Sequence, residues 1–225
     1  MAGTTLSETI YQELYQDISE QRLVCGQKLT LQMLRERFHV SQTPIREALV
    51  RLSEVGLVTY YSNCGVTVTE FEESDICDLY RFAAELDSMA IRFCENSFNH
   101  MPLLMDLEEV IETGNRLLAE GKEREWRACS EQFHTVFYRH AQNRYLDEAS
   151  RSLRAKIDVL SSMYYQENTI EKIHQGHLDI YEEVRAGRYK EAAARMNEHL
   201  QYSMAFALKA YARHHGDRAP ASREN

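Results

Sequence analysis

The chain has 225 residues with a formal net charge of −9 at pH 7, and 44% of its residues are hydrophobic. This length is enough for two modest domains with buried cores. No stretch approaches the roughly 20 apolar residues of a membrane helix, and the N-terminus lacks the basic and apolar regions of a secretion signal. We therefore expect a cytoplasmic protein without a membrane partner. The acidic net charge argues against non-specific affinity for nucleic acid, so any binding to DNA would have to come from a local cationic surface.

Apolar residues at helical spacing predict three short helices in the first third of the chain. The first covers about residues 5–22, the second begins after Thr30, and the third begins after Ser41 and ends at Gly56. Thr30 and Ser41 both suit the N-cap position, where a side-chain oxygen can accept a hydrogen bond from the first turn. The residues expected to face the core are Leu6, Ile10, Leu14, Ile18, Leu31, Leu34, Phe38, Ile45, Ala48, Leu49 and Leu52.

The pattern changes after Gly56 to two short runs of β-branched and aromatic residues, 57–61 and 66–69. The small and polar residues 62–65 lie between them, which is typical of a hairpin turn. Three helices followed by such a hairpin indicate a winged helix-turn-helix.

From Ser74 onward the apolar spacing is helical throughout. Six helices are expected, at about residues 75–96, 102–120, 123–141, 144–165, 169–186 and 188–213. The tail from Gly216 is polar, and we expect residues 216–225 to be disordered. The sequence thus predicts a mainly α protein of two domains, a winged helix-turn-helix at residues 1–72 and an all-helical antiparallel bundle at residues 73–215.

Short polar side chains and one arginine mark the start of the third predicted helix: Ser41, Gln42, Thr43 and Arg46. In a winged helix-turn-helix this helix enters the major groove with its N-terminus first. There Ser41 and Thr43 can contact phosphate. Gln42 can form a bidentate pair with adenine, and Arg46 can bind phosphate or guanine.

The hairpin tip and the second helix are expected to add further DNA contacts. Asn63 and Gly65 belong to a tip small enough to lie along a minor groove or the backbone. Arg35 adds a cationic contact, although Arg35, Arg37 and Arg51 taken alone suit solvated surface as well. Three packed helices without a DNA function are the alternative interpretation of this segment.

The run VSQTPIREAL at residues 40–49 closely resembles the recognition helix of the GntR family of bacterial repressors. The similarity extends from about residue 8 to about residue 70. It includes Leu31, Leu34, Leu52, the Gly56-Leu57-Val58 segment and the wing glycine Gly65. Gln42 replaces the family's usual arginine, which implies a changed base preference and a smaller salt-dependent part of binding. The resemblance implies a homodimer on the near-palindromic half-sites of a double-stranded DNA operator.

Three histidines fall on separate predicted helices beside apolar residues: His134, His177 and His199. Each taken alone suits a hydrogen-bonded position in the core. If the three converge, they form a metal site with open coordination positions. Such a site would also suit a hydrolase or lyase, so a metal-dependent enzyme is the alternative function, and an all-helical interaction module is a third. The sequence contains no HExxH, phosphate loop or nucleophile motif, which favours a protein that is not an enzyme.

The three histidines resemble those of the FCD effector-binding domain, which follows the winged helix in the FadR branch of the GntR family. The resemblance implies a divalent metal ion, zinc or nickel, that anchors a carboxylate effector at His134, His177 and His199. The family's aspartate, four residues before the first histidine, is Ser130 in this chain. Glu131 points about 100° away round the helix and is a poor substitute, so water or effector is left to fill the position.

Arg81 lies in a segment that resembles the first helix of FCD domains, where an arginine can pair with the effector carboxylate. An ion pair with Glu85, four residues later, is the alternative. The resemblance as a whole implies a transcriptional regulator, a repressor in the family's commoner mode, whose operator affinity is controlled by a small organic acid.

Overall fold

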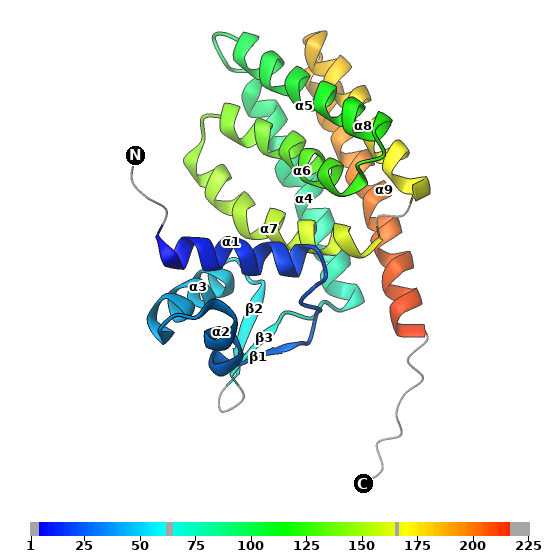
Figure 1. Cartoon of the computed structure of the whole chain (residues 1–225). Helices are drawn as coiled ribbons and strands as arrows, with labels where there is room; N and C mark the ends of the chain where they lie inside the picture. The colour runs from blue at the N-terminus through cyan, green and yellow to red at the C-terminus, as the bar shows by residue number, and fades with distance from the viewer. Residues whose placement is uncertain (1–4, 62–64, 165–166, 217–225) are drawn as a thin grey trace. The chain divides into compact units, whose positions relative to one another are not determined.

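A computed structural model describes residues 5–61, 65–164 and 167–216 (Figure 1). The chain folds into two compact units. The first consists of Met1–Glu72 and Arg151–Ser162, and the second of Glu73–Ser150 and Met163–Asn225. Most of the polar tail, residues 217–225, lies outside the described residues, whereas Gly216 is the last residue of a helix.

The first unit contains three short helices and a small sheet. The helices are α1 (Leu6–Ser19), α2 (Leu31–Phe38) and α3 (Gln42–Glu54), and the strands are β1 (Lys28–Leu29), β2 (Val58–Tyr61) and β3 (Gly65–Val68). The strands are antiparallel in the order β1-β3-β2, with Leu29 opposite Val66 and Thr59 opposite Thr67. The helices and the hairpin agree with the sequence prediction, whereas β1 is an addition to it.

Local sequence features explain where these helices begin and end. Thr30 caps α2 as predicted, because its Oγ1 accepts a hydrogen bond from the backbone N–H of Met33 at 3.2 Å. Ser41 occupies the N-cap position of α3, but its hydroxyl makes no capping hydrogen bond. Gly56 follows α3 with a φ of 75°, a left-handed conformation that a glycine adopts without strain.

Most residues predicted to face the core of the first unit are buried. Buried are Ile10, Leu14, Ile18, Leu34, Ile45, Ala48, Leu49 and Leu52. Burial of a leucine or isoleucine side chain contributes about 1.5–3 kcal/mol, so these residues contribute substantially to the unit's hydrophobic stabilisation. Leu31 and Phe38 are partly buried against this core. The prediction for Leu6 was wrong: its side chain is 52% exposed, because it lies in the first turn of α1.

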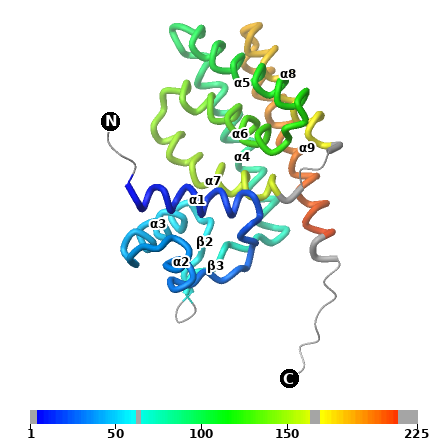
Figure 2. Tube along the Cα trace, in the orientation of Figure 1, coloured from blue at the N-terminus to red at the C-terminus, as the bar shows by residue number. Residues whose placement is uncertain are grey.

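A helix from much later in the chain completes the first unit. Ala155 and Val159 of α7 (Arg144–Tyr164) belong to the same buried core as the three N-terminal helices. The carboxylate of Asp158 accepts hydrogen bonds from Tyr15 Oη at 3.1 Å and from Ser19 Oγ at 2.7 Å. Figure 2 shows the blue trace of α1 beside this part of α7. Residues 151–162 are therefore part of the folded first unit.

The second unit is a bundle of helices. It contains α4 (Glu73–Cys94), α5 (Met101–Ala119), α6 (Glu123–His140), α8 (Glu167–Arg185) and α9 (Tyr189–Gly216), together with the first turns of α7. Helix α4 packs against α9 and α6, α5 packs against α6 and α8, and α8 packs against α9. The aromatic side chains of Tyr80, Trp126, Phe133 and Phe137 are fully buried in it. Among the described residues, no helix is long and apolar enough to span a bilayer.

Candidate functional site

The N-terminal half of α3 presents the predicted recognition side chains to solvent. Ser41, Gln42, Thr43 and Arg46 are exposed, whereas Ile45 on the opposite face is buried. The pKa of Tyr60 on β2 is raised by burial and lowered to a smaller extent by the charge of Arg46, so Arg46 lies near the wing strand. The hydroxyl of Ser41 and the backbone N–H groups of Gln42 and Thr43 can donate hydrogen bonds to an anion such as a DNA phosphate.

Ion pairs separate the arginines of the first unit into two groups. Arg37 pairs with the buried carboxylate of Asp17, and Arg51 pairs with Glu8 at 2.6 Å. Arg35 and Arg46 are exposed and form no ion pair with any described residue. The two arginines assigned to DNA are therefore available to bind phosphate or bases, whereas Arg37 and Arg51 are engaged by carboxylates of α1.

The wing is described only in part. Asn63, assigned to DNA from the sequence, lies outside the described residues. Gly65 begins β3, is exposed, and has a φ of 90°. A side chain at this position would be strained whatever the surrounding space, because β-carbon-bearing residues rarely adopt this conformation.

The structure brings His134 on α6, His177 on α8 and His199 on α9 together in the interior of the second unit. All three side chains are buried, and one ring nitrogen from each lies within 4.8 Å of the other two. Nε2 of His134 is 3.3 Å from Nε2 of His177. Phe133 stacks on His177 with ring centroids 4.3 Å apart, which fixes the plane of that imidazole. We call these three residues the histidine cluster.

The donor atoms of the histidine cluster fit a divalent transition metal. Neutral imidazole nitrogens are ligands that zinc and nickel accept. A tetrahedral zinc ion with Zn–N bonds of about 2.0–2.1 Å holds two nitrogens about 3.3 Å apart. The separation between Nε2 of His134 and Nε2 of His177 is 3.3 Å, as this geometry requires. The three nitrogens as a set lie within 4.8 Å of one another, so the imidazoles would close in slightly around an ion. Three protein ligands leave at least one coordination position for water or a ligand oxygen.

Two further residues adjoin His134, and the sequence predicted only one of them. Ser130 is buried one helical turn before His134 on α6, as its position in the sequence implies. Asp87 on α4 is 1% exposed, and its Oδ2 accepts a hydrogen bond from Nδ1 of His134 at 2.8 Å. Its Oδ1 accepts a hydrogen bond from the hydroxyl of Tyr138. The sequence did contain a signal for Asp87, because this charged residue falls among the apolar residues that form the buried face of α4.

His174, on the same helix as His177, is buried and does not belong to the histidine cluster. The indole N–H of Trp126 donates to Nδ1 of His174 at 3.3 Å. Nε2 of His174 lies 2.8 Å from Oδ1 of Asn115 and therefore carries the proton in this pair. Burial lowers the pKa of His174, so this histidine is neutral at pH 7.

The assignment of Arg81 to an effector stays a prediction. Its side chain is exposed on α4, about 120° round the helix from Asp87, which faces the histidine cluster. The alternative ion pair with Glu85 is absent among the described residues, and Glu85 instead accepts a hydrogen bond from Asn197 at 3.3 Å.

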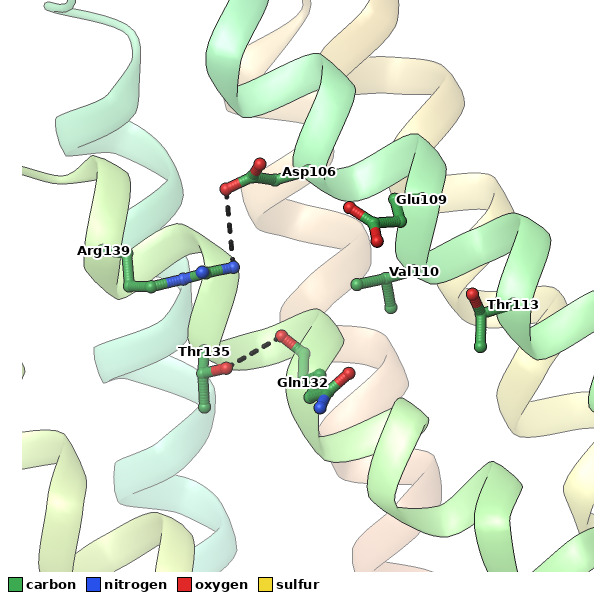
Figure 3. A pocket seen from close by; sticks show the side chains of 7 residues that line it. All are labelled: Asp106, Glu109, Val110, Thr113, Gln132, Thr135 and Arg139. Atoms are coloured by element: carbon green, nitrogen blue, oxygen red, sulfur yellow. Dashed lines mark hydrogen bonds and ion pairs between the residues drawn. The ribbon is translucent and has the colours of Figure 1, made fainter. Parts of the chain in front are cut away.

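A shallow polar groove of about 430 Å³ lies between α5 and α6 (Figure 3). It is lined by Asp106, Glu109, Val110 and Thr113 from α5 and by Gln132, Thr135 and Arg139 from α6. Arg139 reaches across it to Asp106 at 3.5 Å. The α6 residues of the groove lie on a different face of the helix from His134, which is buried, so the groove is separate from the histidine cluster.

A winged helix-turn-helix whose third helix is exposed at its N-terminal end, together with a helical domain, defines a class of bacterial transcription regulators. The chain belongs to the GntR family: residues 6–68 match the family model for bacterial regulatory proteins, gntR family, and residues 78–202 match the FCD domain. The family assignment and the fold class predicted from the sequence are confirmed. Members of this family are transcription regulators, and this protein is accordingly a regulator rather than an enzyme.

Curated relatives match most of the chain. A protein of Paenarthrobacter nicotinovorans, described as a probable D-xylose utilization operon transcriptional repressor, is 24% identical over 203 residues, which are 89% of this chain and 88% of the relative. The Nta operon transcriptional regulator of Aminobacter aminovorans is 29% identical over 179 residues, which are 78% of this chain and 82% of the relative.

Solved structures share the fold at low sequence identity. McbR/YncC of E. coli has a TM-score of 0.80 at 20% identity and covers 93% of this chain and 100% of its own. A GntR regulator from Rhodococcus sp. RHA1 has a TM-score of 0.78 at 19% identity, covering 91% and 98%.

Proposed function

We propose that the protein is a transcriptional repressor that binds a DNA operator as a homodimer and releases it when a small organic acid binds in the second unit. The convergence of His134, His177 and His199 inside the FCD domain carries this proposal. The repressor description of the Paenarthrobacter nicotinovorans relative supports the direction of control. We place this activity in the cytoplasm, where bacterial DNA is found.

The histidine cluster would hold a zinc or nickel ion. When bound, the ion supplies positive charge and open coordination positions to which a carboxylate oxygen binds. The hydroxyl of Ser130 is a weak ligand beside His134, so the position that an aspartate would occupy is left to the effector. This difference supports an acidic effector, because a carboxylate oxygen can fill the coordination position beside the ion that Ser130 leaves open.

The DNA contacts we propose are those of the exposed start of α3. Ser41 and Thr43 bind phosphate, and Gln42 and Arg46 contact base edges in the major groove. Arg35 on α2 adds a phosphate contact, and the wing residues Asn63 and Gly65 lie along the adjacent backbone or minor groove. These groups form a local surface that attracts DNA. The net charge of −9 on the whole chain would by itself repel it.

An exposed apolar stripe on α4 supports the homodimer. Phe82, Met89 and Phe93 share one face of this helix and are 53%, 39% and 39% exposed. Glu85 and Arg92 flank the stripe on one side. In an antiparallel pair of α4 helices with a two-fold axis near Met89, Glu85 meets Arg92 of the second copy, and the reverse pair forms by symmetry. We propose this self-complementary face as the contact between two copies.

Helix α7 offers a route from effector to DNA. It contributes Arg144–Ser150 to the second unit and Arg151–Ser162 to the core of the first. A shift of its N-terminal turns is transmitted along a hydrogen-bonded helix to Ala155 and Val159. The effector changes operator affinity by at most the ratio of its own affinities for the DNA-binding state and the DNA-releasing state of the protein.

The test begins with purified protein and a random double-stranded DNA library, from which the preferred operator is selected. Metal content is measured for the parent and for His177→Ala, and a panel of small organic acids is then screened for release of the operator. We expect near-stoichiometric zinc or nickel in the parent only, and release by an acid only from the metal-loaded parent. Selection of an operator whose binding no acid alters, in protein that takes up no metal, would refute the proposed control.

A further inference from the structure

Asp87 is a buried carboxylate with both oxygens engaged beside the histidine cluster. Its Oδ2 accepts from Nδ1 of His134 at 2.8 Å, and its Oδ1 accepts from Tyr138 Oη. Asp87 and His134 come from α4 and α6, and both side chains are at most 4% exposed. An ionised carboxylate at this depth requires such partners, because an unpaired buried charge is strongly destabilising.

The contact with Asp87 determines which nitrogen of His134 faces the cluster. A carboxylate only accepts hydrogen bonds, so Nδ1 of His134 carries the proton. Nε2 then presents its lone pair on the opposite edge of the ring, where it lies 3.3 Å from Nε2 of His177. Asp87 itself is on the wrong side of the imidazole to bind an ion at Nε2, so it acts through His134.

Two neighbouring residues, Tyr138 and Ser130, indicate what the contact between Asp87 and His134 does. The Tyr138 hydroxyl holds one carboxylate oxygen, which leaves the other directed at His134. Ser130, one turn before His134, offers only a neutral hydroxyl. An imidazole that binds a metal is a neutral ligand as well, so the negative charge nearest to His134 in these contacts is that of Asp87.

We propose that Asp87, held by Tyr138, is a positioning residue for the metal site and supplies from α4 the negative charge that Ser130 does not supply from α6. The inference rests on the proposed metal site. A carboxylate hydrogen-bonded to a metal-binding histidine fixes the ring and strengthens its donor nitrogen, and loss of such a partner lowers metal affinity about 10- to 100-fold.

The test measures Co²⁺ and Zn²⁺ binding to the full-length protein by the visible absorption of Co²⁺ and by competition with Zn²⁺. Asp87→Asn is expected to weaken binding about 10-fold and to change the Co²⁺ absorption bands, because it removes the charge with little change in size. Tyr138→Phe is expected to have a smaller effect in the same direction. Ser130→Asp added to Asp87→Asn is expected to restore affinity, because the carboxylate then lies beside the ion itself.

Operator binding and urea unfolding of the metal-free variants show whether they are folded. If Asp87→Asn and Tyr138→Phe bind both metals with the affinity and spectrum of the parent, Asp87 is a structural residue only and the inference is wrong. If the parent binds neither metal, and His177→Ala behaves identically, the proposed metal site fails and the inference fails with it. Weaker binding that Ser130→Asp does not restore would overturn the charge compensation.

Discussion

Gly176 on α8 lies directly against the imidazole of His199 on α9. A Cβ placed on Gly176 would be 2.5 Å from Nδ1 of His199, closer than the 3.0 Å below which real Cβ atoms essentially never approach a neighbour. The absence of a side chain at position 176 therefore allows the ring of His199 to approach His177 to a centroid separation of 4.6 Å.

Gly176→Ala is expected to displace His199 and to weaken zinc binding by about 10-fold or more, comparable to the loss of a residue that orients a ligand. Zinc competition titrations would measure this effect. The double variant Gly176→Ala/His199→Ala serves as the control and should bind no more weakly than His199→Ala alone. Undiminished zinc affinity in Gly176→Ala would show that His199 is not a ligand in its observed position.

Arg46→Ala and Arg35→Ala are each expected to weaken operator binding and to reduce the slope of log affinity against log salt by about 1, because each removes one phosphate-binding cation. If Arg46 contacts a base, Arg46→Ala is expected to lower the binding free energy by about 1–3 kcal/mol, by an amount that depends on the operator sequence. Fluorescence anisotropy at several salt concentrations would measure both quantities.

Arg185→Ala is a suitable control, because Arg185 belongs to the second unit and pairs with Glu182 at 2.6 Å. Arg51→Ala should lower the stability of the fold, because Arg51 pairs with Glu8 and lies 4.1 Å from the ring centroid of Tyr11. Unchanged operator affinity in both Arg46→Ala and Arg35→Ala would remove α3 and α2 from the DNA interface.

Single charge reversals on α4 are expected to weaken the homodimer. Glu85→Arg and Arg92→Glu each place like charges opposite one another across the proposed interface, whereas the double reversal restores opposite charges. Sedimentation analysis over a range of concentrations should show more monomer for each single variant and recovery for the double variant. Lys190→Glu, at an exposed position on α9, is the charge-matched control. Equal dimerisation of all variants would place the interface elsewhere.

His174 is expected to make stability depend on pH. Burial lowers its pKa below the ordinary value of 6.5, so at pH values between the folded pKa and 6.5 the unfolded chain binds more protons than the folded one. The contribution of His174 to the free energy of unfolding is complete above 6.5 and is lost as the pH falls toward the folded pKa. Urea unfolding of metal-free protein between about pH 7.5 and about pH 5.5 should show a shallower decline for His174→Gln than for the parent. Parallel declines in the two proteins would contradict this assignment.

The helices of both units were predictable because each buries a face that repeats in the sequence at helical spacing. Strand β1 (Lys28–Leu29) could not be predicted, because two residues are too few to show an alternating pattern. The N-cap role of Thr30 was visible because it depends on local hydrogen bonds. The ion pairs of Arg37 and Arg51 could not be predicted from the sequence, because their acidic partners lie on another helix.

The candidate metal site was predictable in part. His134, His177 and His199 could be selected because they resemble the histidines of a known domain, and the structure brings them together. Asp87 could not be assigned, because its contact with His134 joins residues separated by 47 positions on two different helices. An aspartate within an apolar stripe signals a buried partner without identifying it.

The place of α7 in the first unit limits how this regulator can be divided. Residues 151–162 supply Ala155, Val159 and the carboxylate of Asp158 to the core and hydrogen bonds of the DNA-binding unit. A gene fragment ending near Glu72 would encode α3 but not α7. The core residues that pack against Ala155 and Val159 would then be exposed to solvent. A chimeric regulator made by exchange of N-terminal segments therefore needs the matching residues of α7 from the same parent protein.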